Sequence, residues 1–163
     1  MKINLEVNTS DTSDLHTKQT YEVNVITFFL VVVFIICYLS RVSSVLNKNN
    51  RSYGKNYMFD NCPETCWNSD AGTLQWIIIE FEQEYEVSSF EIEFQGGFVG
   101  KNCHLEVGNK ETKFHESFYP EDKNTIQSFI LTNPIKAKTF KFVFNESTDF
   151  FGRIIIYKLS LYS

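Results

Sequence analysis

Apolar and polar residues alternate along much of the C-terminal two thirds of the chain, with the period of two that strands buried on one face require. In the segment 87–94, Phe90, Ile92 and Phe94 share one face while glutamates occupy the other. Phenylalanines alternate in the same way in the segment 138–144. We predict strands at 76–81, 87–94, 103–107, 113–118, 125–131, 138–144 and 153–161.

These predicted strands follow one another at short intervals, and no segment between them has the periodicity of an amphipathic helix. The pattern is typical of an all-β fold, an antiparallel β-sandwich of the jelly-roll type. Residues 40–163 are predicted to form this domain. At about 120 residues, it is long enough to bury a core without disulfides or metal.

Two segments precede the domain. Residues 1–24 are polar and are predicted to be a disordered tail. Residues 25–39 carry no charge and, with their neighbours, approach the about 17–20 residues that a membrane-spanning helix needs. Such a helix would place the domain in the cytosol, because basic residues follow it. Two other interpretations stay open: a buried strand of the sandwich, or an extension that comes from a doubtful gene model.

Charge and residue patterns argue against two classes of function. The formal net charge of −5 disfavours direct binding to nucleic acid, whose phosphates attract basic surfaces. No histidine accompanies a serine or cysteine in a nucleophile motif, and the glycines at Gly96 and Gly97 follow a strand without opening a helix. We therefore predict a protein that is not an enzyme, with no catalytic residues and no cofactor.

The cysteines favour a reducing compartment. The chain has four, of which Cys37 lies in the apolar run and Cys62, Cys66 and Cys103 lie in the predicted domain. Three thiols cannot all pair, and Cys62 and Cys66 lack the second ligand pair that a structural zinc site needs. We predict reduced thiols, no metal and a location in the nucleus or cytoplasm. The alternative is a single-pass membrane protein with its domain in the cytosol.

Several motifs resemble a known family. The sequence ETCWNSD at 64–70, the strand QWIIIEF at 75–81 and the closing GRIIIYKL at 152–159 are similar to those of discoidin domains. These domains are also called coagulation factor V/VIII type C domains and are galactose-binding-like in fold. More closely, the chain resembles a family of small intracellular proteins that associate with a testicular orphan nuclear receptor and repress it. The stretches that carry this closer resemblance are 40–47, 64–70, 94–98, 118–122 and 148–153.

The resemblance implies a jelly-roll sandwich whose loops at one end form the recognition surface. For the closer family it implies contact with a nuclear receptor that lowers transcription. The alternatives are a module that binds carbohydrate or lipid head groups, and a membrane-tethered scaffold that uses residues 25–39. Some relatives bind a structural calcium ion near the positions of Asp60 and Thr65, but the last strand here has no carboxylate to complete such a site. We therefore expect these two side chains to hydrogen-bond within their own loop.

Five residues are candidates for binding a partner, and each has a structural alternative. Trp67 is either an exposed stacking platform or a core residue, whereas Trp76, within the most apolar strand, is predicted to be core. Phe98 lies on a loop tip or folds back over the sandwich. Of Phe150 and Phe151, one is expected to fill the end of the sandwich and the other to be exposed. Arg153 binds either an acidic partner or Asp149. The candidate partner-binding residues are Trp67, Phe98, Asp149, Phe151 and Arg153.

Overall fold

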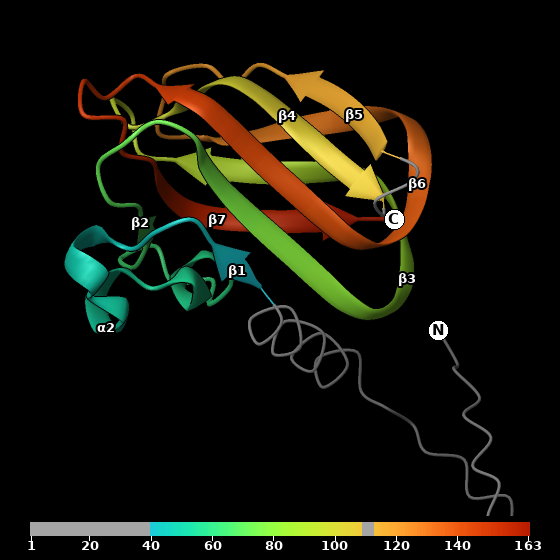
Figure 1. Cartoon of the computed structure of the whole chain (residues 1–163), viewed down its shortest axis with the longest axis horizontal. Coiled ribbons are helices and arrows are strands. Elements are labelled where there is room, and N and C mark those ends of the chain that lie inside the picture. Colours follow the sequence, from blue (N-terminus) through green and yellow to red (C-terminus); the bar gives the residue numbers. More distant parts are fainter. Residues whose placement is uncertain (1–39, 109–112) are drawn as a thin grey trace, which may run out of the picture.

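The computed structural model of this chain describes residues 40–108 and 113–163. Seven strands and three short helical segments make up this part (Figure 1). The strands are β1 (Arg41–Val42), β2 (Trp67–Asn68), β3 (Gln75–Phe94), β4 (Gly100–Gly108), β5 (Lys113–Phe118), β6 (Ile126–Ser147) and β7 (Ile155–Tyr162). The helical segments are η1 (Leu46–Lys48), α2 (Asn50–Tyr53) and η2 (Lys55–Met58), which lie together beside β1 (Figure 1).

Two long strands, β3 and β6, bend and so join the two layers of the fold. They pair with each other antiparallel, and their register breaks between Glu80 and Tyr85. The sequence predicts separate strands at 76–81 and 87–94, but these are the two halves of β3. In the same way, the predicted strands at 125–131 and 138–144 are the ends of β6. Figure 1 shows both strands curving around one end of the molecule.

The pairing partners define the two layers. The first half of β3 and the second half of β6 lie in one layer with β1, β4 and β5. The second half of β3 and the first half of β6 lie in the other with β7, which in turn pairs with β2. This arrangement agrees with the predicted all-β antiparallel fold.

Phenylalanine rings fill the space between the layers. Phe90 contacts both Phe142 and Phe118, with ring centroids 5.1 Å apart and the rings near perpendicular. Phe94 meets Phe144 in the same edge-to-face manner at 5.9 Å. The alternation in the sequence is thereby confirmed, because the phenylalanines of each predicted apolar face are buried.

The N-terminal segments are outside the described part of the chain. The predictions of a polar tail at 1–24 and of an apolar run at 25–39 both fall there. Within residues 40–108 and 113–163, no helix is both long enough and apolar enough to span a bilayer.

Candidate functional site at the loop end of the sandwich

Three loops meet at one end of the sandwich: 69–74 before β3, 95–99 after β3, and 148–154 between β6 and β7. Backbone hydrogen bonds connect them. The amide of Gly72 donates to the carbonyl of Phe151 at 2.8 Å, and the amide of Thr148 donates to that of Val99 at 2.9 Å. The loops therefore form one continuous surface, at the left of Figure 1.

An arginine lies at the centre of this surface. The Arg153 guanidinium binds the Asp149 carboxylate with two nitrogens, Nε at 3.1 Å and Nη2 at 3.2 Å. It also lies over the rings of Phe98 and Phe151, with Cζ 4.9 Å and 5.8 Å from their centroids. Four of the five candidate residues thus lie in one cluster, and the Asp149–Arg153 ion pair predicted as an alternative is present.

Asp149 organises the loop that carries these residues. Besides the guanidinium, its carboxylate accepts hydrogen bonds from the backbone amides of Phe151 and Arg153, at 3.2 and 3.1 Å. The hydrogen bond from the Arg153 side chain is the main reason why the pKa of Asp149 lies below its usual value. The same hydrogen bond raises the pKa of Arg153. Both groups are therefore charged at neutral pH, and the loop is closed around their pair.

The two adjacent phenylalanines of this loop both face outward. Phe150 is 93% exposed and Phe151 is 61% exposed, and their rings contact each other edge to face at 5.3 Å. The expectation that one of them fills the end of the sandwich is wrong, because Met58, Trp67 and Ile154 already occupy the interior. We call Phe98, Phe150, Phe151 and Arg153 the aromatic rim.

A glycine allows the rim loop to approach its neighbour. Gly152 has a φ of +80°, and a Cβ at this position would lie 2.6 Å from the carbonyl oxygen of Gly72. A side chain here would push the loops apart. Leu74, in the same 69–74 loop as Gly72, is 56% exposed and has a φ of +66°.

The two tryptophans correct the sequence-based prediction. Trp67 is fully buried, and its indole N–H donates to the carbonyl of Ser44 at 3.0 Å, so it cannot serve as an exposed stacking platform. Trp76 is only half-buried. Next to it in β3, Ile77 and Ile79 face the core, and alternation places Trp76 on the opposite face.

The loop with Asp60 and Thr65 behaves as expected. Thr65 Oγ1 donates to Asp60 Oδ2 at 2.7 Å, and the amide of Cys62 donates to Asp60 Oδ1 at 2.9 Å. These side chains hydrogen-bond within their own loop. The cysteines of the described part, Cys62, Cys66 and Cys103, are unpaired thiols, and burial raises the pKa of Cys103 to about 12.

Sequence reasoning missed three features of the described chain. Phe150 is absent from the candidate partner-binding residues, although two adjacent aromatics before a glycine in a turn favour exposure. Leu74 gives no signal in the sequence. The histidines at 104 and 115, with Glu106, are separated along the chain but lie within 4.8 Å of one another through their ligand atoms. Only the pairing of β4 with β5 could have predicted that cluster.

Residues 40–156 match the sequence profile of the F5/8 type C domain. The chain belongs to the F5/8 type C domain family. It is also a homologue of nuclear receptor 2C2-associated protein. It is 50% identical to that of Danio rerio over 75% of this chain and 88% of the relative. It is 48% identical to the Homo sapiens protein over 74% of this chain and 88% of the relative. The resemblance found from the motifs is thereby confirmed.

Solved structures confirm the F5/8 type C sandwich. A family 32 carbohydrate-binding module of Clostridium perfringens NanJ, solved with galactose, has a TM-score of 0.64 at 18% identity. It covers 79% of this chain and 97% of its own. Chitosan-binding module 1 of a Paenibacillus sp. IK-5 chitosanase/glucanase has a TM-score of 0.63 at 15% identity, covering 76% and 93%. At these identities the likeness establishes the fold alone. F5/8 type C domains are binding modules, and the homologues are named as associated proteins.

Proposed function

We propose that this F5/8 type C protein is an intracellular adaptor that binds a nuclear receptor through its aromatic rim and lowers the receptor's transcriptional activity. Support for the partner comes from the relatives, which are named for association with nuclear receptor 2C2 and match most of this chain. Support for the surface comes from the geometry of the rim. The nucleus or cytoplasm is the location that this role requires.

The exposure of Phe150 and Phe151 is the observation that carries the choice of surface. Burying either ring against a partner would remove a large apolar area from water, about 25 cal/mol per Å². Aromatic and arginine side chains dominate the binding energy of protein interfaces, and the rim combines both. Because Asp149 and the two flanking rings already hold Arg153 in place, little side-chain entropy remains to be lost on binding.

A carbohydrate or lipid head-group ligand is the second candidate. The solved neighbours include modules with bound galactose and with bound GalNAc-β-1,3-galactose. Exposed rings at a loop end can stack on a sugar. Against this candidate, two of the five N–H donors of Arg153 are already bound to Asp149, so only part of the guanidinium can donate to sugar hydroxyls. A membrane-tethered form of the same module would require residues 25–39 to span a bilayer.

Biolayer interferometry with the full-length chain and purified nuclear receptor 2C2 tests the proposal. The wild type and Ile130→Ala are expected to bind alike, because Ile130 is an exposed apolar residue on β6, outside the rim. Phe151→Ala is expected to weaken binding at least about tenfold, the loss of one interface hot spot. A glycan array and liposomes run in parallel address the alternative. If the wild type does not bind the receptor but binds a sugar or lipid saturably, and Phe151→Ala abolishes that binding, the second candidate function is correct and the adaptor function is wrong.

A further inference from the structure

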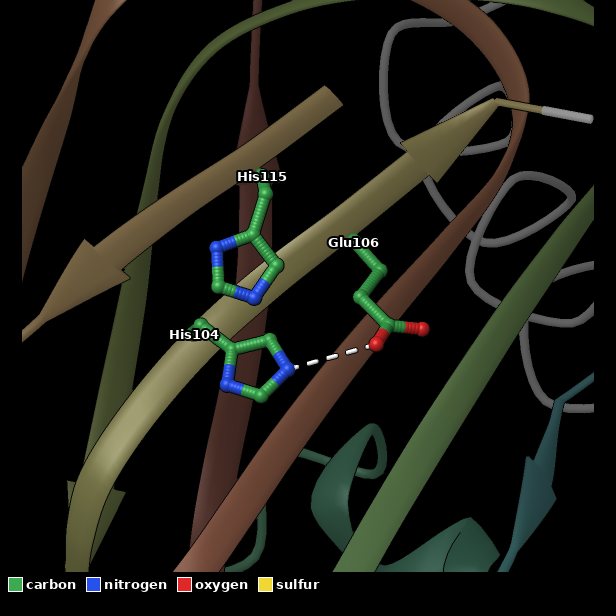
Figure 2. A group of neighbouring side chains, drawn as sticks. All are labelled: His104, Glu106 and His115. Atoms are coloured by element: carbon green, nitrogen blue, oxygen red, sulfur yellow. Dashed lines mark hydrogen bonds and ion pairs between the residues drawn. The ribbon is translucent and has the colours of Figure 1, made fainter. Parts of the chain in front are cut away.

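Two histidines and a glutamate gather on the outer face of the layer that contains β4, β5 and β6. His104 and Glu106 are two residues apart on β4 and so point to the same side of the sheet. Their neighbours on β4, among them Leu105, point into the core. Glu106 lies directly opposite His115 on β5. Pairing of the two strands therefore brings together three side chains that the sequence separates (Figure 2).

The three side chains are close enough to share one small ligand. Their potential ligand atoms all lie within 4.8 Å of one another. His104 Nε2 is 3.3 Å from Glu106 Oε1, and the two imidazole rings stack with centroids 4.0 Å apart. The His104 side chain is 13% exposed and that of Glu106 is 27% exposed, whereas His115 lies open to solvent. His104 and Glu106 are thus largely shielded from solvent, whereas an ion can reach the cluster from the side of His115.

We propose that His104, Glu106 and His115 form a site for a divalent transition-metal ion, and for Zn²⁺ in particular. Two imidazoles and one carboxylate are a ligand set that zinc accepts, with a fourth position left open for water or an outside ligand. The same set binds Ni²⁺ and Cu²⁺, whereas Mg²⁺ and Ca²⁺ require oxygen ligands. Because all three ligands stand on paired strands, the site is held by the sheet rather than by a loop.

A lysine on the third strand orients the carboxylate. Lys141 lies opposite Glu106 on β6, and its Nζ is 3.0 Å from Glu106 Oε2, which leaves Oε1 facing the histidines. The hydrogen bond from Lys141 is also the main cause of the lowered pKa of Glu106, so the carboxylate is ionised before an ion arrives. The positive charge of Lys141 opposes a bound cation. The site is therefore expected to bind zinc less tightly than one without this lysine.

Hydrogen bonds fix where the proton of His104 lies without metal. Asn145 Nδ2 donates to the carbonyl of Asn102 at 2.6 Å and lies 3.3 Å from His104 Nδ1. An amide nitrogen only donates, so Nδ1 accepts and the single proton of the neutral ring sits on Nε2, toward Glu106. When zinc binds Nε2, this proton leaves Nε2 and Nδ1 takes one up from solvent, so the ring stays neutral. Asn145 must then turn its oxygen toward Nδ1, which breaks its hydrogen bond to the Asn102 carbonyl and is expected to weaken zinc binding.

Calorimetric titration of the full-length, reduced chain with zinc chloride tests the stoichiometry and the ligands. One ion per chain is expected to bind, and His115→Gln should weaken binding at least about tenfold, because loss even of an outer partner of a metal ligand typically costs about 10–100-fold. His16→Gln is the matched control, since it removes the third histidine of the chain and should change nothing. The Cys62→Ser/Cys66→Ser variant should also bind normally. The proposal is overturned if no zinc binds, if His115→Gln binds like the wild type, or if the cysteine variant loses the ion.

Nitrogen chemical shifts of the imidazole rings provide a readout that a merely structural role for the histidines would not change. The ¹⁵N spectrum of the metal-free chain should show His104 protonated on Nε2. Addition of zinc should move the proton to Nδ1 and give Nε2 the shift of a metal-bound nitrogen. If His104 keeps its Nε2 proton at saturating zinc, the ion binds elsewhere and the assignment of the site is wrong.

Discussion

The phenylalanines inside the sandwich and those of the 148–154 loop lie near opposite extremes of solvent exposure. Phe140 and Phe142 are fully buried, whereas Phe150 is 93% exposed. The core rings come from strands in which apolar residues alternate with polar ones. The exposed rings of Phe150 and Phe151 come from a loop in which the Asp149 carboxylate accepts hydrogen bonds from the backbone amides of Phe151 and Arg153.

This difference separates residues that maintain the fold from residues that need another explanation. Each fully buried phenylalanine contributes about 1.5–3 kcal/mol through the water-exposed area that it loses. Phe150 gains nothing comparable, because its ring remains in water. Exposed apolar rings beside a fixed arginine instead favour a protein-binding surface, because aromatic and arginine side chains dominate the binding energy of protein interfaces. The following predictions test that contrast, from the largest expected effect on stability to the smallest.

Phe142→Ala should lower the free energy of unfolding by about 3–5 kcal/mol, because it leaves a cavity between the layers. Phe142 contacts the rings of Phe90 and Phe118, which cannot both move to fill the space. Urea unfolding of the full-length chain, followed by the fluorescence of its two tryptophans, Trp67 and Trp76, measures the change. A loss below about 1 kcal/mol would mean that the layers are not packed as the structure has them.

Gly152→Ala should cost about 1–3 kcal/mol, because the new methyl group forces both a strained backbone and a clash with Gly72. Gly97→Ala is the matched control. Its φ of +82° imposes a similar backbone strain, but no atom lies within 4 Å of the added Cβ. Comparing the two variants by urea unfolding isolates the contact between the loops. Equal losses would contradict the close approach on which the rim depends.

Acid should open the rim loop before it unfolds the core. The folded-state pKa of Asp149 is lowered by Arg153, so the pair stabilises the protein above the unfolded value of about 3.9. That contribution is lost as the pH falls through the folded-state pKa. An NMR pH titration should therefore show the amides of Phe151 and Arg153 shifting together below about pH 4. Asp149→Asn should abolish the shared titration, and a transition near neutral pH would contradict the assignment.

Phe150→Ala should change the free energy of unfolding by no more than about 0.5 kcal/mol, as exposed substitutions do. Among residues 40–108 and 113–163, its ring contacts only that of Phe151, at the surface. The same urea experiment gives the value, and Phe142→Ala gives the scale. A loss of more than about 1 kcal/mol would show that the ring has a structural role and would remove the argument for its binding role.

The same contrast shows how far the sequence determines the structure. Alternation predicts the buried faces of β3 and β6 because a strand has a fixed period and the sandwich needs one apolar face per layer. The bends that make each of them continuous were not predicted, since the polar stretch around Glu82 resembles a loop when it is considered alone.

Residues outside regular strands could not be placed by periodicity. Trp67 is buried because β2 pairs with β7 and because the carbonyl of Ser44 meets its indole from 23 residues away. The histidine cluster depends on the register of β4 against β5, which no local pattern encodes. In contrast, Asp149 and Arg153 are four residues apart, and their ion pair could be predicted because it is local.

We propose that the aromatic rim is the surface that contacts the nuclear receptor. Chemical-shift mapping tests it most directly, with ¹⁵N-labelled full-length chain titrated with unlabelled nuclear receptor 2C2. We expect the amides of Gly72, Phe98 and Phe151, in the rim loops, to change most. Those of Tyr119 and Ile130, which are exposed residues outside the rim, should stay unchanged. Changes confined to Tyr119 and Ile130, with an unaffected rim, would contradict it.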